Sequence, residues 1–224
     1  MKRFFKPFIR EHYKEGIQGK RILVVGASCY CSKKEECKYF SECTNSDKKD
    51  SSKFDDDCPD YKRRKTKLSD EPTTIIKQDY PAPHNFALFI QKFVGEEDTW
   101  TTWKRMAYTE YLQFISPTSK TCGSYLSERD FKAFEETIIE LQPHIIVVWG
   151  KTIIKDIRIR GEKNKYIYDC EELKETNNYI CHMKVPGVNH NITLVNCYHP
   201  SDIYRHWSNN LPDFTKYMQI ALDE

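Results

Sequence analysis

The chain has 224 residues, 39% of them hydrophobic and 13% aromatic, which suffices for one substantial core and does not require a second domain. No apolar stretch approaches the roughly 18 residues of a membrane span, and the start of the chain lacks the apolar segment of a secretory signal. We therefore expect a single-domain, cytoplasmic protein over residues 1–224 that has no membrane partner. The formal net charge of +2 neither requires nor excludes a nucleic acid partner.

The N-terminal half predicts a buried strand, a polar insertion and two helices. Residues 21–25 form an aliphatic run that ends at Gly26, which is typical of a buried strand that meets a tight turn. Residues 31–80 are rich in Lys, Asp, Ser and Cys but poor in aliphatic residues, so we expect a Cys-rich charged insertion within the domain. Helical spacing of apolar residues then predicts amphipathic helices at 86–93 and 100–114.

The C-terminal half predicts strands that alternate with helices. Ser127 and Asp130 have the spacing of a capping box, which opens a helix that runs to about residue 142. Further strands are expected at 144–149, 166–168, 179–184 and 192–197, with a short helix after Gly150 and a C-terminal helix near 211–222. This alternation favours a largely parallel sheet covered on both faces, with its ligand site at the carboxyl ends of the strands.

Four segments near predicted strand ends carry polar or aromatic residues. They are V-G-A-S-C-Y at 25–30, Y-T-E-Y-L-Q-F at 108–114 leading to Pro117, W-G-K at 149–151 and N-C-Y-H-P-S at 196–201. In this order they resemble the landmarks of the uracil-DNA glycosylase-like superfamily, as a divergent member. The order and the strand context carry the resemblance, because no single segment is specific.

The resemblance implies a fold and a reaction. The fold is a three-layer α/β/α arrangement around a central, mainly parallel sheet of about four strands. The reaction is hydrolysis of the N-glycosidic bond of a damaged or modified base that is flipped out of DNA into a pocket at the strand ends. DNA is then the partner. Cleavage leaves negative charge on the departing base, which donors that face the base oxygen stabilise.

Two residues are candidates for catalysis by position. His199 would be the donor to the base, and its alternative role is to cap the turn after the last strand. Glu110 stands where the family has a base-reading asparagine. Three interpretations of Glu110 stay open: it accepts from the amino group of cytosine or adenine, it polarises water, or it is an exposed helix residue.

The segment after the first strand is expected to form a wall of the pocket. The resemblance implies base contacts from Gly26, Ala27 and Ser28, an aromatic wall from Tyr30, and a further contact from Ser201. Ala27 stands where some relatives have an acid, and neither a carboxylate nor a proline follows before the insertion. The residue that activates water is therefore unassigned.

Two segments outside the pocket are expected to contact DNA. The basic cluster of the insertion suits phosphate contacts, although such a cluster is commonly just a solvated loop. Residues 202–207 occupy the place of the family loop that wedges into the duplex, or they form a short helix that buries Ile203 and Trp207. The expected DNA-binding residues are Lys62, Arg63, Arg64, Lys65, Tyr204 and Arg205.

The nine cysteines would be reduced in the cytosol, so metal ligation or burial explains them better than disulfides. Cys31, Cys37, Cys43 and Cys58 cluster in the insertion, where few apolar residues are present to hold a loop in shape. A structural zinc site with four thiolates would do so. An iron–sulfur cluster is less favoured, because the family pattern places its ligands differently. Free thiols in a flexible loop remain the alternative, and the glycosidic chemistry needs no cofactor.

Three functions stay open from the sequence. The first is a DNA glycosylase, and the second is a protein of the same fold that binds a modified base or a DNA end without cleavage. The third is a hydrolase of free modified nucleosides or nucleotides. A dinucleotide-binding loop and a nucleophile elbow are rejected, because V-G-A-S at 25–28 lacks the glycine patterns of G-x-G-x-x-G and G-x-S-x-G.

Overall fold

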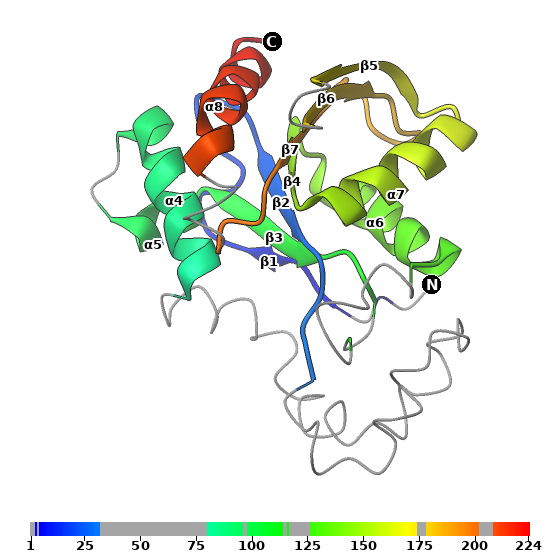
Figure 1. Cartoon of the computed structure of the whole chain (residues 1–224), viewed down its shortest axis with the longest axis horizontal. Helices are drawn as coiled ribbons and strands as arrows, with labels where there is room; N and C mark the ends of the chain where they lie inside the picture. The colour runs from blue at the N-terminus through cyan, green and yellow to red at the C-terminus, as the bar shows by residue number, and fades with distance from the viewer. Residues whose placement is uncertain are drawn as a thin grey trace.

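The computed structural model describes residues 3, 5–31, 80–95, 98–113, 116, 126–173, 178–201 and 208–224. Within these ranges seven strands form one sheet, in the order β1-β3-β2-β4-β7-β6-β5 (Figure 1). The strands are β1 (Phe8–Ile9), β2 (Ile22–Gly26), β3 (Met106–Glu110), β4 (Ile145–Trp149), β5 (Ile167–Leu173), β6 (Asn178–Met183) and β7 (Ile192–Cys197).

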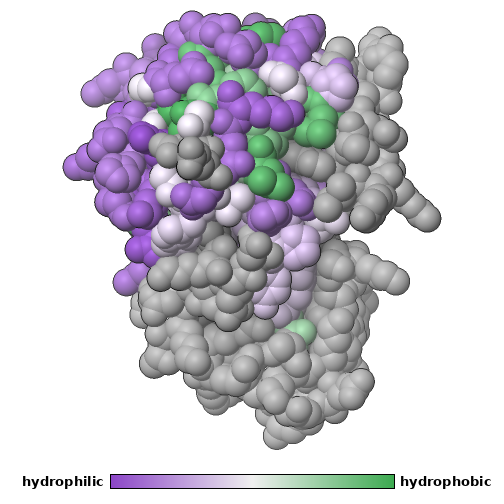
Figure 2. Space-filling model, turned by 90° about the vertical axis from the view of Figure 1, so that its left-hand side faces the viewer, coloured by the Kyte–Doolittle hydropathy of each residue, from purple (hydrophilic) through white to green (hydrophobic). Residues whose placement is uncertain are grey.

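Helices cover both faces of the sheet, which makes three layers (Figure 1). On one face lie α4 (Pro81–Val94), α5 (Thr99–Trp103) and α8 (Ser208–Asp223), and on the other lie α6 (Glu128–Leu141) and α7 (Lys151–Lys163). Alternate side chains of a strand point to opposite faces, so Val24 packs in the core with α4 and α8, and Val25 packs with α6 and α7. The outward side of the α4 and α5 layer is mainly hydrophilic, with small hydrophobic spots (Figure 2).

The sheet is mixed and larger than expected. Its four central strands are parallel, since β2 pairs with β3 and β4, and β4 pairs with β7. β1 adds to β3 in the antiparallel sense, and the β5–β6 hairpin adds antiparallel to β7. The α/β class is confirmed. The expected sheet of about four mainly parallel strands was wrong, because β1 at one edge and the β5–β6 hairpin at the other extend the parallel centre.

The helix predicted over 100–114 was wrong for most of its length. The helix α5 ends at Trp103, and the segment from Met106 to Glu110 is β3, in parallel register with β2. All five residues of β3 are buried, so the strand shows no alternation of apolar and polar residues that would separate it from a helix. Glu110 therefore ends a central strand, where the sequence had left open an exposed helix position.

The other central elements agree with the sequence. The strands at 144–149 and 192–197 and the C-terminal helix are confirmed, and the helix after Gly150 is longer than expected. The capping box is also confirmed, because the backbone and the hydroxyl of Ser127 donate to Asp130. Asp130 also accepts from the backbone of Gln113 at 2.7 Å, which joins the start of α6 to the chain after β3.

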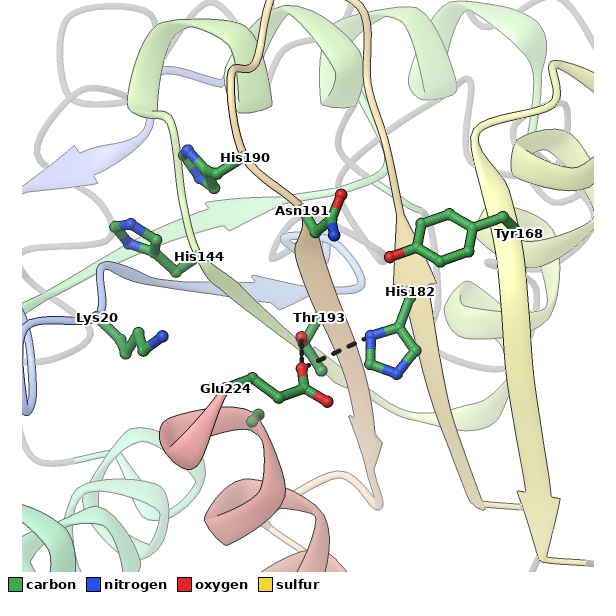
Figure 3. A pocket seen from close by; sticks show the side chains of 9 residues that line it. Lys20, His144, Tyr168, His182, His190, Asn191, Thr193 and Glu224 are labelled. Atoms are coloured by element: carbon green, nitrogen blue, oxygen red, sulfur yellow. Dashed lines mark hydrogen bonds and ion pairs between the residues drawn. The ribbon is translucent and has the colours of Figure 1, made fainter.

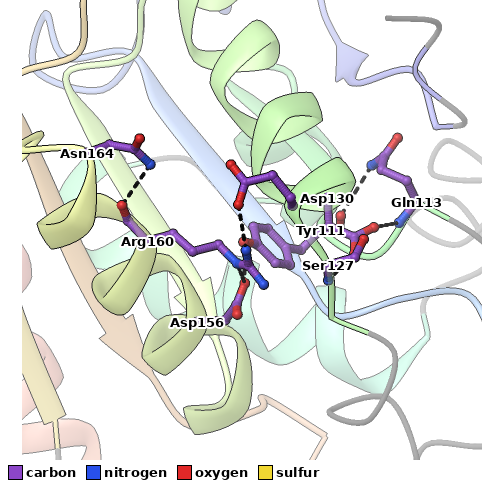
Figure 4. A network of polar contacts seen from close by, with 8 residues as sticks. Tyr111, Gln113, Ser127, Asp130, Asp156, Arg160 and Asn164 are labelled. Carbon is purple, nitrogen blue, oxygen red and sulfur yellow. Dashed lines mark hydrogen bonds and ion pairs between the residues drawn. The ribbon is translucent and has the colours of Figure 1, made fainter. Parts of the chain in front are cut away.

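A polar network fixes the segment after β3 against both helices of its face (Figure 4). The Tyr111 hydroxyl donates to Asp156 of α7 at 2.7 Å, and Arg160 donates to the same carboxylate oxygen at 2.8 Å. Burial raises the pKa of Tyr111 well above 10, with the nearby Asp156 charge as the next cause, so its hydroxyl remains a donor. Because Tyr111 directly follows Glu110 in the chain, these contacts with α7 also hold Glu110 in position.

Cys170 and Cys181 face each other in β5 and β6 and form a disulfide. Their Cα atoms are 4.0 Å apart. Residues that lie directly opposite in antiparallel strands place their side chains together on one face, which brings these two sulfurs into contact. The expectation that the cysteines are better explained without disulfides was wrong for this pair.

None of the helices in the described ranges is long and apolar enough to cross a membrane.

A cavity of about 420 Å³ lies at the amino ends of β4 and β7 and is lined by three histidines (Figure 3). His144 accepts from the backbone N–H of Arg21 at 3.0 Å and stacks on His190 with a centroid distance of 4.3 Å. Across the cavity, Thr193 donates to Glu224 at 2.6 Å. Burial, and next the charge of Arg21, lower the pKa of His144 to about 4.

We expect His144 to make the protein less stable as the pH falls from about 6.5 to 4. In that window the unfolded chain binds a proton at His144 that the folded protein does not, so stability is present above pH 6.5 and is lost below it. His144→Asn keeps an acceptor for Arg21 but does not titrate. Urea unfolding at pH 4 and pH 7 should show a loss only about 1 kcal/mol larger for the wild type, because solvent screens part of the effect at this half-buried side chain. Equal losses would contradict the assignment.

Candidate functional site

A pocket of about 370 Å³ opens at the carboxyl ends of the central strands, the edge toward the bottom of Figure 1. Its walls are residues 28–30 after β2, the end of β3, the end of β4, the segment after β7, and residues 80–83 at the start of α4. Parallel strands bring their carboxyl ends to one edge, which is why distant segments meet here. The volume lies near the lower limit for small-molecule sites, about 300 Å³, and so suits a group of roughly the size of one base.

The pocket brings together most of the catalytic and base-contacting residues predicted from the sequence. Its lining includes Ser28, Tyr30, Glu110, His199 and Ser201. Gly26 and Ala27 lie directly behind it, where their carbonyl oxygens accept from the backbone N–H groups of Tyr111 and Leu112 at 3.0 Å each. The pairing of the β2 and β3 segments therefore continues beyond the ends of the two strands.

Glu110 is the carboxylate of this pocket and is only 4% exposed. Its Oε1 accepts from the Tyr108 hydroxyl at 2.8 Å, and the Cys29 Sγ lies 3.9 Å from the same oxygen. Burial, followed by the Glu110 charge, raises the pKa of Tyr108 well above 10, so the tyrosine is the protonated partner and donates. The interpretation of Glu110 as an exposed helix residue was thus wrong, because it ends a buried strand.

Gly26 makes this arrangement possible. A Cβ atom at Gly26 would lie 2.7 Å from Glu110 Oε2 and 3.0 Å from Tyr108 Cζ, and closer still to the Tyr108 hydroxyl. Those separations are shorter than any normal contact of a methyl group. The side chains of Tyr108 and Glu110 therefore occupy the space that a side chain at Gly26 would fill.

The ring of His199 has a defined orientation. The backbone N–H of Ser201 donates to His199 Nδ1 at 3.3 Å, and the Ser201 hydroxyl lies 2.7 Å from the same nitrogen. Since an N–H group can only donate, Nδ1 is an acceptor, and the neutral ring carries its proton on Nε2. Nδ1 thus caps the turn after β7, the alternative role considered from the sequence. Nε2 carries the N–H group, which is the donor of the ring. Asn85 of α4 donates to the Pro200 carbonyl at 2.8 Å and so holds this loop.

Trp149 at the end of β4 separates the two polar sides of the pocket. Its ring centroid is 5.8 Å from that of His199, in an edge-on contact, and 5.4 Å from that of Tyr108. Only 2% of Trp149 is exposed. Tyr30, on the segment after β2, is 38% exposed. The pocket therefore has a buried aromatic side at β4 and a partly exposed aromatic residue beside it.

The sequence did not identify the other lining residues, which are residues 80–83 at the start of α4 together with Cys29, Tyr108 and Trp149. Trp149 was treated only as part of a landmark, and Tyr108 and Cys29 were given no role. A signal existed for Trp149, because an aromatic residue directly before Gly150 ends a predicted central strand. No comparable signal existed for Tyr108, since β3 itself was predicted as a helix.

The predicted metal and DNA contacts fall mainly on other parts of the chain. Lys62, Arg63, Arg64, Lys65, Tyr204, Arg205, Cys37, Cys43 and Cys58 lie outside the described residues. Cys31 is described, and its backbone N–H donates to the Ser116 carbonyl at 2.8 Å. Within the described ranges, no group of three or more His, Cys, Asp or Glu residues is placed to hold a metal ion. The zinc site in the insertion stays a prediction.

Comparison with known proteins assigns no family. No protein-family model and no curated protein matches this chain. The case for a function therefore rests on the pocket: its position at the strand ends, its size, and the side chains of Glu110 and His199.

We predict that Gly26→Ala destabilises the protein by about 2 kcal/mol and disturbs the pocket, because the new methyl group displaces Tyr108 and Glu110. Adding Tyr108→Phe removes the nearest atom of the clash. Urea unfolding of the two single variants and the double variant tests the coupling, which should recover about 1 kcal/mol in the double variant. Strictly additive effects would mean that the two residues are not in contact.

Proposed function

We propose that this protein is a DNA glycosylase that hydrolyses the N-glycosidic bond of a damaged or modified base flipped out of DNA. The observation that carries the proposal is the meeting of His199, Glu110 and Tyr30 in one base-sized pocket at the carboxyl ends of parallel strands. The resemblance of the four strand-end segments to the uracil-DNA glycosylase-like superfamily supports it, since those segments converge on this pocket.

The pocket supplies a donor for the departing base. When the bond between the anomeric carbon and the base nitrogen breaks, its electron pair stays on the base, and a carbonyl oxygen of the base takes up negative charge. His199 Nε2–H donates to that oxygen, in the tautomer that the contacts of Nδ1 with Ser201 select. Water then adds its oxygen to the anomeric carbon, and its proton leaves to solvent or to the base.

An aromatic wall compensates for the stacking that the base loses on leaving the duplex. Trp149 and Tyr30 line the pocket together with residues 80–83, which include two prolines. Contact of a base with an aromatic face is worth about 1–3 kcal/mol, comparable to the cost of unstacking one base. A base enclosed in this way is also removed from water, which strengthens its hydrogen bond with His199.

A protein that binds a base without cleaving it is the second candidate. Glu110 is the only carboxylate among the described residues that line the pocket, and its Oε1 already accepts from Tyr108. The segment after β2 contributes none, whereas a hydrolase gains from an acid that orients water. This candidate predicts binding of DNA that carries an unusual base, without release of that base.

The test compares the wild type with His199→Ala on DNAs that carry deaminated, oxidised and hypermodified bases, with detection of the released base by mass spectrometry. We expect release by the wild type and a 10²- to 10³-fold lower rate for His199→Ala, the usual effect of removing such a donor. His182→Ala, at the opposite edge of the sheet, is the matched control and should keep the wild-type rate. Equal rates for His199→Ala and the wild type would refute the assigned role, and binding without any release would select the second candidate.

A further inference from the structure

We propose that the base taken by this pocket is a cytosine-type pyrimidine, with an amino group on C4 that donates to Glu110 and an oxygen on C2 that accepts from His199. This inference rests on the proposed function, because it assigns the edge of a base that enters the same pocket. Three features of the described residues carry it: the chemistry of Glu110, the placement of His199, and what lies between them.

Glu110 presents an acceptor to the pocket. A carboxylate has no hydrogen to donate, and Oε1 accepts from two side chains, the hydroxyl of Tyr108 and the thiol of Cys29. The contact with Tyr108 also fixes the orientation of the carboxylate, because Tyr108 is itself fully packed against Trp149. A base that approaches this group therefore needs a donor on the facing edge.

His199 presents the complementary donor from the other side. β2 and β4 lie between β3 and β7 in the sheet, so Glu110 at the end of β3 and His199 after β7 stand on opposite sides of the pocket. The ring of Trp149 lies between His199 and Tyr108. A bound ring must thus offer an acceptor toward β7 and a donor toward β3.

A 4-amino-2-oxo pyrimidine has this pattern along one edge. Its C2 oxygen accepts and its C4 amino group donates, and the hydrogen bond of the amino group to a carboxylate is strengthened by charge. Uracil and thymine have an oxygen on C4, which would place two acceptors against each other in a buried site. Adenine has the amino group but no carbonyl oxygen for His199. Guanine also has a carbonyl oxygen and an amino group along one edge but is a two-ring base, so the cytosine type is the match among the single-ring bases.

The experiment uses pairs of duplexes that differ only at C4 of one base: cytosine and uracil, 5-methylcytosine and thymine, 5-hydroxymethylcytosine and 5-hydroxymethyluracil. Each target stands opposite an abasic site, so that no base pair is lost on extrusion. Initial rates of base release are measured, together with affinities for the same DNAs made with a non-hydrolysable 2′-fluoroarabino nucleotide. We expect the amino member of each pair to be favoured about 10- to 100-fold, the discrimination typical of a specific hydrogen-bonding contact to a base.

Variants at β3 separate the role of the carboxylate from that of its neighbour. Glu110→Gln keeps the size of the side chain but adds a donor, so the preference within each pair should fall to about threefold or less. Tyr108→Phe keeps the carboxylate but removes the hydrogen bond that orients it, so the preference should fall less than with Glu110→Gln. His182→Ala, far from this pocket, should retain the full preference. Thermal unfolding of each variant verifies that it is folded.

The outcomes are distinguishable. A wild-type preference for the oxo members, or a preference that Glu110→Gln leaves unchanged, overturns the inference. If those oxo bases are released and the release needs His199, the glycosylase proposal still stands. If no base is released and none is bound in preference to another, the proposed function and this inference fail together.

Discussion

The candidate site depends on one close approach, at the point where β2 ends on Gly26 opposite Glu110. Because Gly26 has no side chain, Tyr108 and Glu110 pack directly over the end of β2 and direct a buried carboxylate into the pocket. Any larger residue would displace both side chains. The glycine that ends the first predicted strand is thus explained by the neighbouring strand β3, whose side chains fill the space beside it.

The two sides of the pocket are held by different means. On the β3 side, Tyr111 and Asp156 connect the strand end to α7, in a network mostly removed from water (Figure 4). On the β7 side, Ser201 sets the tautomer of His199, and Asn85 of α4 binds the carbonyl of Pro200. Each polar group is therefore positioned by contacts with a helix layer as well as by its own strand, which is the preorganisation that electrostatic stabilisation of a reaction requires.

The elements predicted correctly from the sequence were those whose residue pattern fits only one kind of secondary structure. The strands at 144–149 and 192–197 are uniformly apolar because helices cover both of their faces, and the capping box at Ser127 is a local signal. Sequence reasoning failed at β3, whose buried residues also fit a helical period, and for that reason the role of Glu110 was left open between a pocket carboxylate and an exposed helix residue. The pairing of Cys170 with Cys181 could not be predicted either, since it depends on the register of a hairpin. His199 was found because its segment is a recognisable landmark, whereas Trp149, although it ends a predicted strand, was not assigned to the pocket until the structure placed it beside His199 and Tyr108.

In the proposed function, an extruded base occupies the pocket between His199 and Glu110. The most direct measurement is a crystal structure of the protein with duplex DNA that carries one 2′-fluoroarabino cytidine, whose glycosidic bond resists cleavage. The account predicts this base in the pocket, with its C2 oxygen within hydrogen-bonding distance of His199 Nε2 and its amino group on Glu110. A base that stays stacked in the duplex, or DNA bound at a different surface while this pocket holds no base, would contradict the account.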